Sequence, residues 1–210
     1  MSSRNVTAIV LAAGLSTRMG GRLKPMLSLG DLTVIDHILS ELSACAIDEI
    51  VVVTGHQRES LEQHLADRFV KTVFNPDYAN GEMLYSIQCG LRAASSDSDA
   101  AMIVLGDQPA LERAVVRSVI AAFQRGQGKI VIPSFQMRRG HPIMIARIFW
   151  DTILALGDKT LRDFMREQAK HIYHVNVDTP SILRDMDTPD EYQRELAEYA
   201  SRRRIVPVLV

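Results

Sequence analysis

The chain has 210 residues, of which 47% are hydrophobic and 23% charged. This length favours a single domain, here residues 1–210, and the apolar content excludes a disordered chain and a fibrous repeat. With 24 basic and 25 acidic residues the net charge is −1, so no overall field favours a nucleic acid or a membrane surface as the partner.

Nearly unbroken apolar runs alternate with segments of helical periodicity. The runs predict strands at 6–12, 50–54, 102–105 and 129–132, because strands of a parallel sheet that is covered on both faces are apolar throughout. Apolar residues that recur every three or four positions predict helices at 34–42, 83–91 and 115–123. A last helix begins near Pro189, with Thr188 as N-cap and Glu191 closing a capping box. This alternation predicts an α/β fold with a mostly parallel central sheet and helices on both faces.

The pattern is less regular between residues 135 and 177, where prolines and short helical segments occur. We expect one or two antiparallel strands there, near 143–146 and 171–177. The apolar end of the chain, 205–210, is either an added strand or a contact with a partner. Two cysteines, no signal peptide and no apolar run of about 20 residues predict a cytoplasmic protein without a membrane span.

Four polar loops follow successive predicted strands, at 12–24, 54–57, 75–77 and 106–109. In open sheets of this kind ligands bind outside the carboxyl ends of the strands. A tight turn explains any one of these loops equally well, but four of them on one edge favour a binding site.

The first loop has the composition of a phosphate-binding loop. Small residues at Ala12, Ala13 and Gly14 let a ligand approach free backbone N–H groups, and Arg18 and Lys24 add positive charge. The dinucleotide fingerprint is missing because Leu15 and Ser16 follow Gly14, and a Walker A loop needs four residues between its glycines where this chain has five. The loop therefore belongs to neither class, which disfavours a Rossmann-type oxidoreductase.

Two further segments carry charged groups, one an acid suited to a metal ion and the other a pair of cations suited to an anion. Asp107 follows a strand and is either a turn cap or a Mg²⁺ ligand, with Asp185 or Asp187 as the second acid. The segment Arg138-Arg139-Gly140-His141 is either solvated surface or a clamp on a second, anionic substrate.

Taken together, these motifs resemble those of MobA-like nucleotidyltransferases, and most of all the molybdenum cofactor cytidylyltransferase branch. The opening Leu11-Ala12-Ala13-Gly14, Ser16, Arg18-Met19-Gly20 and Lys24 matches the opening motif of that family. The likeness continues in Gly81 through Ser86 and Leu91, Gly106-Asp107-Gln108-Pro109, Arg139-Gly140-His141-Pro142 and Asp185-Met186-Asp187-Thr188-Pro189.

The resemblance implies a Rossmann-like nucleotidyltransferase that moves NMP from an NTP onto a phosphate-bearing acceptor, such as molybdopterin, and releases pyrophosphate. It implies catalytic roles for Arg18, Lys24 and Asp107, Mg²⁺ held by Asp107 and Asp187, and acceptor binding by Arg139, Gly140 and His141. Its nucleotide-binding set is Leu11, Ala12, Ala13, Gly14, Ser16, Arg18, Met19, Gly20, Lys24, Gly81 and Ser86. The methyl group of Ala13, where the guanylyl branch has glycine, favours CTP over GTP.

One departure concerns the acceptor. Cytidylyltransferases of this branch often carry Gly-Asp-x-Gly-Ala-Arg, whereas this chain has Gly157-Asp158-Lys159-Thr160-Leu161-Arg162. Thr160 and Asp163 still form a helix N-cap, but the close approach of a glycine is lost. The acceptor therefore stays open between molybdopterin and a sugar or polyol phosphate. A nucleotide-sensing module without turnover is the other alternative, and we expect a monomer or a small homo-oligomer.

Overall fold

A computed structural model describes residues 4–80, 83–157 and 159–205 of the chain. The predicted site residue Gly81 and the tail at 206–210 lie outside the described residues. The strands are β1 (Val6–Ala12), β2 (Ser28–Leu29), β3 (Leu32–Thr33), β4 (Glu49–Thr54), β5 (Lys71–Phe74), β6 (Ala100–Leu105), β7 (Ile130–Phe135), β8 (Arg138–Arg139), β9 (Ile143–Ala146) and β10 (Ile172–Asn176). The helices are α1 (Val34–Ser43), α2 (Arg58–Leu65), α3 (Met83–Ala93), α4 (Arg113–Gln124), α5 (Trp150–Leu154), α6 (Leu161–Glu167) and α7 (Pro189–Ile205). All four runs expected as strands and all three periodic segments expected as helices are confirmed.

The strands of the described chain form one large sheet and a small hairpin. The large sheet has the order β10-β7-β9-β6-β1-β4-β5, with β8 paired to β7, and β2 pairs with β3. Strand β1 runs parallel to both of its neighbours, and β4 runs parallel to β5. The predicted mostly parallel sheet is therefore confirmed, and the loops that follow β1, β4, β5 and β6 emerge at one edge.

The less regular stretch holds one of the two expected antiparallel strands. Strand β9 pairs in antiparallel fashion with β6 and β7, as expected. The antiparallel direction expected near 171–177 is wrong, because β10 runs parallel to β7. Since β9 carries the chain back to the edge where β7 begins, the next strand to pair with β7 starts from that same edge and follows its direction.

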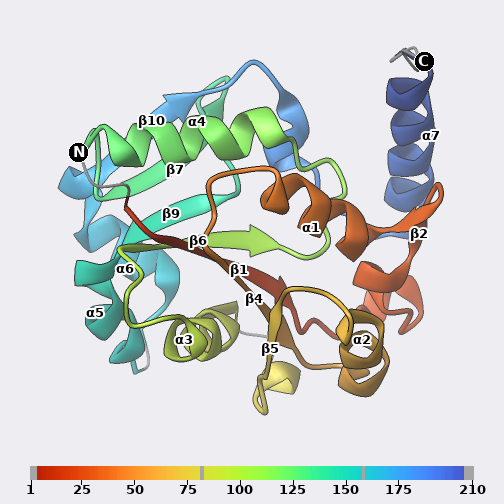
Figure 1. Ribbon diagram of the computed structural model, residues 1–210, viewed down its shortest axis with the longest axis horizontal. Helices are drawn as coiled ribbons and strands as arrows, with labels where there is room; N and C mark the ends of the chain where they lie inside the picture. The colour runs from red at the N-terminus through yellow and green to blue at the C-terminus, as the bar shows by residue number, and fades with distance from the viewer. Residues whose placement is uncertain (1–3, 81–82, 158, 206–210) are drawn as a thin grey trace.

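Helices cover both faces of the large sheet (Figure 1). One layer packs α1, α2 and α4 against Ala8 and Val10 of β1, and the other packs α3, α5 and α6 against Ile9. Because side chains alternate along a strand, neighbouring residues of β1 serve different layers. Full burial of each large aliphatic side chain contributes about 1.5–3 kcal/mol. None of the helices in the described part of the chain is long and apolar enough to cross a membrane.

The last helix begins as the sequence predicts. The Thr188 hydroxyl accepts a hydrogen bond from the Glu191 N–H at 3.3 Å, and the Glu191 carboxylate accepts one from the Thr188 N–H at 2.8 Å. The same carboxylate accepts a bond from the Asp187 N–H at 2.9 Å. Helix α7 is held further along by Arg184, whose guanidinium pairs with Glu195 and Glu198. The predicted N-cap of α6, Thr160 with Asp163, is also present.

Candidate active site

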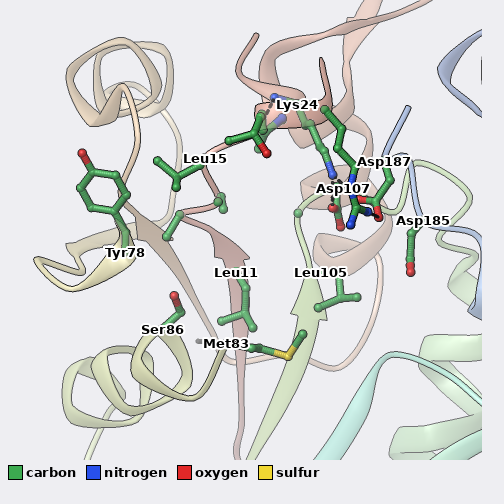
Figure 2. Close-up of a pocket in the computed structure, with 18 residues that line it drawn as sticks. Leu11, Leu15, Lys24, Tyr78, Met83, Ser86, Leu105, Asp107, Asp185 and Asp187 are labelled. Carbon is green, nitrogen blue, oxygen red and sulfur yellow. Dashed lines mark hydrogen bonds and ion pairs between the residues drawn. The ribbon is translucent and has the colours of Figure 1, made fainter. Parts of the chain in front are cut away.

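A cavity of about 650 Å³ opens at the edge of the sheet from which the four loops emerge, and the loops after β1 and β6 line it (Figure 2). Its volume lies in the range of small-molecule and cofactor sites. Many of the predicted site residues line it, namely Leu11, Ala12, Ala13, Gly14, Ser16, Arg18, Lys24, Ser86, Asp107 and Asp187. Charged groups gather at one side of the cavity, beside Lys24, and mostly apolar groups lie at the other.

The loop after β1 lines this cavity and carries backbone donors that have no partner in the described residues. Within the described chain, the N–H groups of Gly14, Leu15 and Ser16 donate no hydrogen bond. The loop is closed instead by bonds from Met19 N–H and Gly21 N–H to the Ser16 carbonyl, at 2.9 and 3.1 Å. Adjacent unpaired N–H groups form a concave anion site. The loop can therefore receive phosphate oxygens without breaking its own structure.

The loop after β4 supports the first loop rather than lining the cavity. The His56 N–H donates to the Ala13 carbonyl at 3.2 Å, and the Gln57 amide donates to the Gly21 carbonyl at 2.9 Å. These bonds hold both ends of the first loop. They explain why a polar segment follows β4 even though His56 and Gln57 are absent from the cavity wall.

Three segments distant in sequence bring opposite charges together in the cavity. The Lys24 ammonium lies 2.9 Å from Asp107 Oδ2 and 2.6 Å from Asp187 Oδ1. The Arg18 guanidinium lies 2.9 Å from the other oxygen of Asp187. The Lys24 side chain is only 12% exposed, whereas that of Arg18 is 72% exposed. Lys24 is thus fixed inside the cluster, and Arg18 is free to swing toward a ligand.

The cluster shifts the ionisation of its members in different directions. Burial acts to lower the pKa of Lys24, but Asp107 and Asp187 outweigh it, so the pKa lies above its usual value and the ammonium stays charged. Burial raises the pKa of Asp107 more than the neighbouring ammonium lowers it. The hydrogen bond from Lys24 lowers the pKa of Asp187. Burial and the neighbouring ammonium thus act on the Asp107 carboxyl in opposite directions.

The third acid of this region has another partner. The Gln108 amide donates to the Asp185 carboxylate at 2.7 Å, and the Met186 N–H donates to the Asp107 carbonyl at 3.1 Å. The latter bond ties the segment before α7 to the loop after β6. Of the two candidates that the sequence leaves open, Asp187 is the one that shares a cation with Asp107.

The two carboxylates fit a divalent metal. Asp107 and Asp187 converge on a single ammonium, so both present oxygens to the same point. Mg²⁺ is commonly bound by one or two carboxylates together with substrate phosphates and water. No group of three or more His, Cys, Asp and Glu side chains suited to a metal occurs in residues 4–80, 83–157 and 159–205. Two carboxylates alone would leave the other coordination positions of such an ion to water or to a ligand.

The other half of the cavity includes residues that the sequence analysis missed. Leu15, Tyr78, Met83 and Leu105 line it together with Leu11 and Ser86 (Figure 2). Leu105 lies opposite Leu11 in the register of β6 and β1, so parallel pairing of these strands is the signal that predicts it. Tyr78 directly follows the third polar loop, but nothing in the sequence indicates the direction of its ring.

Some predicted residues lie away from the cavity wall. Met19 is 2% exposed and packs beneath the loop, and Gly20, at φ 65°, ends the short helical turn there. Arg139, Gly140 and His141 do not line the cavity. A Cβ on Gly140 would lie 2.1 Å from the Ile182 carbonyl oxygen, so close packing alone accounts for this glycine. Burial lowers the pKa of His141 to about 4, which keeps its ring neutral near pH 7.

Comparison with known proteins places these features in context. A family model described as "MobA-like NTP transferase domain" matches residues 8–172. The molybdenum cofactor cytidylyltransferase of Escherichia coli (strain K12) is 29% identical over 189 residues, which cover 89% of this chain and 93% of that protein. The solved structure of the homologue of Mycobacterium tuberculosis Rv0371c from Mycobacterium sp. strain JC1 has a TM-score of 0.83 and 28% identity, with 96% of this chain and 100% of the other covered. A nucleotidyl transferase from Methanothermobacter thermautotroptrophicus has a TM-score of 0.79 and 25% identity, with 94% and 99% covered.

Proposed function

Since the chain belongs to the MobA-like NTP transferase family and is a nucleotidyltransferase, we propose that it moves CMP from CTP onto a phosphate-bearing acceptor, such as molybdopterin, and releases pyrophosphate. The family resemblance that the motifs predict is confirmed by these matches. The observation that carries the proposal is the convergence of Lys24, Asp107 and Asp187 beside a loop of free N–H groups. This combination suits a triphosphate with its metal.

The chain's own residues would act mainly by positioning and by stabilising charge. The N–H groups of Gly14, Leu15 and Ser16 bind phosphate oxygens, and Lys24 and Arg18 neutralise charge on the triphosphate. An acceptor phosphate oxygen then attacks the α-phosphorus in line, the bond to the bridging oxygen breaks, and pyrophosphate leaves. Because a phosphate acceptor has no proton that must be removed, no general base is required. Preorganised donors of this kind each contribute about 10²–10³ in rate.

Nucleotidyltransferases of this family commonly use divalent metals, and we propose Mg²⁺ here, held by Asp107 and Asp187. The bound ion supplies charge neutralisation at the phosphates. Lys24, which pairs with both carboxylates when no metal is bound, would then have its ammonium available for the triphosphate.

The apolar half of the cavity would hold the nucleoside. Leu11, Tyr78 and Met83 provide hydrophobic surface for a base, and Ser86 provides a polar group among them. The methyl group of Ala13 reduces the space beside the base and so favours the smaller pyrimidine. The name of the Escherichia coli relative, a molybdenum cofactor cytidylyltransferase, supports both the cytidine nucleotide and molybdopterin or the molybdenum cofactor as the acceptor.

The acceptor would bind on the other side of Asp107, toward Arg139 and His141. Burial lowers the pKa of His141 and the negative charge of Asp107 acts to raise it, so this segment lies near the charged cluster. Gly140 lets this segment pack against the Ile182 carbonyl, where a Cβ would not fit. The changed segment from Gly157 to Arg162 keeps a sugar or polyol phosphate as the second candidate acceptor, and GTP stays the second candidate nucleotide. The cytoplasmic location and the monomeric or small homo-oligomeric state stay predictions.

Pyrophosphate release tests the proposal directly. The protein is incubated with Mg²⁺, one of CTP, GTP, ATP or UTP, and one acceptor from a panel of molybdopterin and sugar or polyol phosphates. We expect release with CTP and molybdopterin to exceed every other pair. Nucleotide binding without release across the whole panel would instead favour a sensing module.

Thermal unfolding provides the binding measurement that release alone does not give. Ligand at about 100 times its Kd adds roughly 2.7 kcal/mol of stability, or about 5–10 °C in Tm for a chain of this size. We expect Mg²⁺ with CTP to give the largest shift of the four nucleotides. A larger shift with GTP would overturn the assignment of the base.

A further inference from the structure

Three polar side chains form a row across the strands at the end of the sheet away from β5 (Figure 1). Arg139 of β8 lies directly opposite Ser134 of β7, and Ser134 lies opposite Asn176 of β10. Residues opposite each other on paired strands point to the same face of a sheet, and neighbouring strands are about 5 Å apart. Arg139, Ser134 and Asn176 therefore share one face, and we call these three residues the donor row.

The donor row lies at the same edge of the sheet as the cavity. Both pairings of β9 are antiparallel, so β7 runs in the direction of β6, and Ser134 stands near the end of β7 just as Asp107 follows the end of β6. Ile132, two positions before Ser134, packs in the layer of α3, α5 and α6. Because α3 also lines the apolar half of the cavity through Met83, the row and that half lie on the same face of the sheet.

Arg139 is the member of the row on the side of Asp107. Strand β10 occupies one side of β7 along residues 130–134, so β8 and β9 both pair with its other side, which is the side of β6. His141, two residues after Arg139, lies close enough to Asp107 to sense its charge. All three row residues stay outside the wall of the cavity. The row is thus beside the cavity but not part of it.

The serine at the centre of the row is buried without a hydrogen-bond partner. Ser134 is 5% exposed, and its hydroxyl makes no hydrogen bond within residues 4–80, 83–157 and 159–205. Its neighbours on both sides, in β8 and β10, all belong to these residues. In the same part of the chain only Arg113 Nε is both fully enclosed and unpartnered, so the Ser134 hydroxyl reaches the surface. It is therefore available to a ligand as a hydrogen-bond donor.

The row also carries a positive charge that no carboxylate balances. Arg139 and Asn176 are exposed, and their side chains make no hydrogen bond or ion pair with another described residue. His174, two positions before Asn176, faces the same side. Partial burial and the Arg139 cation lower the pKa of His174, and no carboxylate of the described chain acts against them. An unbalanced guanidinium beside a free hydroxyl and a free amide is suited to an anion.

We propose that the donor row binds an anionic group of the acceptor other than the phosphate that reacts, so that the preferred acceptor carries two anionic groups. This inference rests on the proposed function. The reacting oxygen must reach the α-phosphorus at the cavity, whose wall excludes the row. The row then holds a remote part of the same molecule. Both candidate classes of acceptor include such molecules, namely a sugar bisphosphate and the molybdenum cofactor, whose oxo-molybdenum centre is anionic.

Acceptor pairs that differ only in the second anionic group test this selection. Pyrophosphate release with Mg²⁺ and CTP is compared for glucose 1,6-bisphosphate against glucose 1-phosphate, and for molybdenum cofactor against metal-free molybdopterin. In the pair that wild type uses, we expect a preference for the member with two anionic groups. Arg139→Gln should raise the KM for that member about 10–100-fold, the effect of one charged hydrogen bond, and the KM for the other member less than about threefold.

The other kinetic constants should change little in Arg139→Gln. A remote anchor binds the ground state and the transition state equally, so kcat with saturating acceptor should stay near the wild-type value. The KM for CTP and the increase in Tm with Mg²⁺ and CTP should also be those of wild type, because Arg139 lies outside the cavity wall.

Neighbouring substitutions separate the row from a general effect of charge or folding. Arg138→Gln removes the same charge one position earlier, but Arg138 lies opposite Phe135 and so faces the other side of the sheet. This control should behave as wild type. Asn176→Asp keeps the shape and adds a negative charge to the row, and Ser134→Ala removes one donor, so each should raise the KM about tenfold. Because the Ser134 hydroxyl has no partner, Ser134→Ala should lose no stability in urea unfolding.

Binding of inorganic phosphate gives a readout that needs no turnover. The ring NMR signals of His174, identified by their loss in His174→Gln, should shift when phosphate is added at constant pH. In Arg139→Gln the same shift should need about tenfold more phosphate than in Arg138→Gln. A shift that is the same in both variants would overturn the assignment of the anion to the row.

The outcomes distinguish this inference from the proposed function. If wild type releases no pyrophosphate with any nucleotide and acceptor, the proposed function fails, and the inference about the acceptor fails with it. If release occurs without a preference for the member with two anionic groups, the inference alone is overturned. An equal rise in KM for both members in Arg139→Gln also overturns it, because Arg139 would then bind the reacting phosphate.

Discussion

The ammonium nitrogen of Lys24 lies 2.9 Å from a carboxylate oxygen of Asp107, although 83 positions separate the two residues. The same nitrogen lies 2.6 Å from Asp187, on a third segment. A cation on a flexible stem thus sits between two acids that suit a divalent metal. On the proposed function, a divalent metal held by these carboxylates would compete with the lysine for them, and a bound triphosphate would give the lysine another anion.

Replacing Lys24 with alanine should therefore have two opposite effects. Pyrophosphate release should fall by about 10²–10³, or roughly 3–4 kcal/mol of transition-state stabilisation. Affinity for Mn²⁺ or Mg²⁺ without nucleotide should rise about tenfold, because the competing ammonium is gone. Calorimetric titration with the metal alone measures the second effect. Lys71→Ala is the matched control, because Lys71 begins β5 and its ammonium donates to the Ala93 carbonyl instead of to the acids of the site. Unchanged metal affinity in Lys24→Ala would contradict the competition.

The acids of the site should differ in importance. Asp107→Asn should lower metal-dependent turnover by about 10²–10³, because an amide neither neutralises a metal nor holds it as a carboxylate does. Asp185→Asn should lose no more than about tenfold, since its carboxylate is engaged by Gln108. Steady-state rates over a range of Mg²⁺ concentrations separate the two. An equal loss in both variants would mean that Asp185 also binds the metal.

Replacing Gly90 with alanine should affect stability, whereas the same replacement at Gly14 should affect nucleotide binding. A Cβ on Gly90 of α3 would lie 2.2 Å from Ile9 Cγ2 on β1, so Gly90→Ala should reduce the free energy of unfolding by about 1–3 kcal/mol through overpacking. A Cβ on Gly14 meets nothing within 4 Å, so Gly14→Ala should leave stability nearly unchanged and weaken CTP binding at the loop. Urea unfolding and nucleotide titration test both variants. Weaker CTP binding in Gly90→Ala but not in Gly14→Ala would argue against the loop.

Stability should fall in mild acid because of His141. Burial lowers its pKa from 6.5 to about 4 in the folded chain. Between these two values the unfolded chain binds a proton that the folded chain does not, so the free energy of unfolding decreases as the pH falls through this window. At a pH of about 4.5 the loss from this residue is about 2–3 kcal/mol.

The difference between wild type and His141→Asn measures this contribution. Urea unfolding at a pH of about 7.5 and again at about 4.5, without metal or nucleotide, should show a smaller acid loss in the variant. Because the other titratable groups are common to both proteins, their effects cancel. Parallel pH profiles of the two proteins would show that His141 does not cause the loss.

Local patterns predicted most of the scaffold because each is set by short-range physics. The apolar run at β1 and the capping box of Thr188 and Glu191 depend only on neighbours in sequence. The direction of β10 depends instead on the strand with which it pairs, and nothing in the sequence of residues 172–176 indicates that this partner is β7.

The site was predictable to a similar extent. Lys24 and Asp107 follow strands of one sheet and meet at its edge, as the alternation of elements implies. Tyr78 and Met83 were missed because their position depends on how α3 packs over β5. The roles of Arg139 and Gly140 stay predictions, since these residues lie away from the cavity wall.

The hydrogen bond from the Asp187 N–H to the Glu191 carboxylate connects the C-terminal helix α7 to the charged cluster of the cavity. Asp187 is oriented by the first turn of α7, and that helix is anchored through Arg184. A tether, tag or fusion attached beyond α7 would therefore pull on the segment that orients the Asp187 carboxylate. Handles for purification or immobilisation belong at the opposite terminus, where they leave the orientation of Asp187 unchanged.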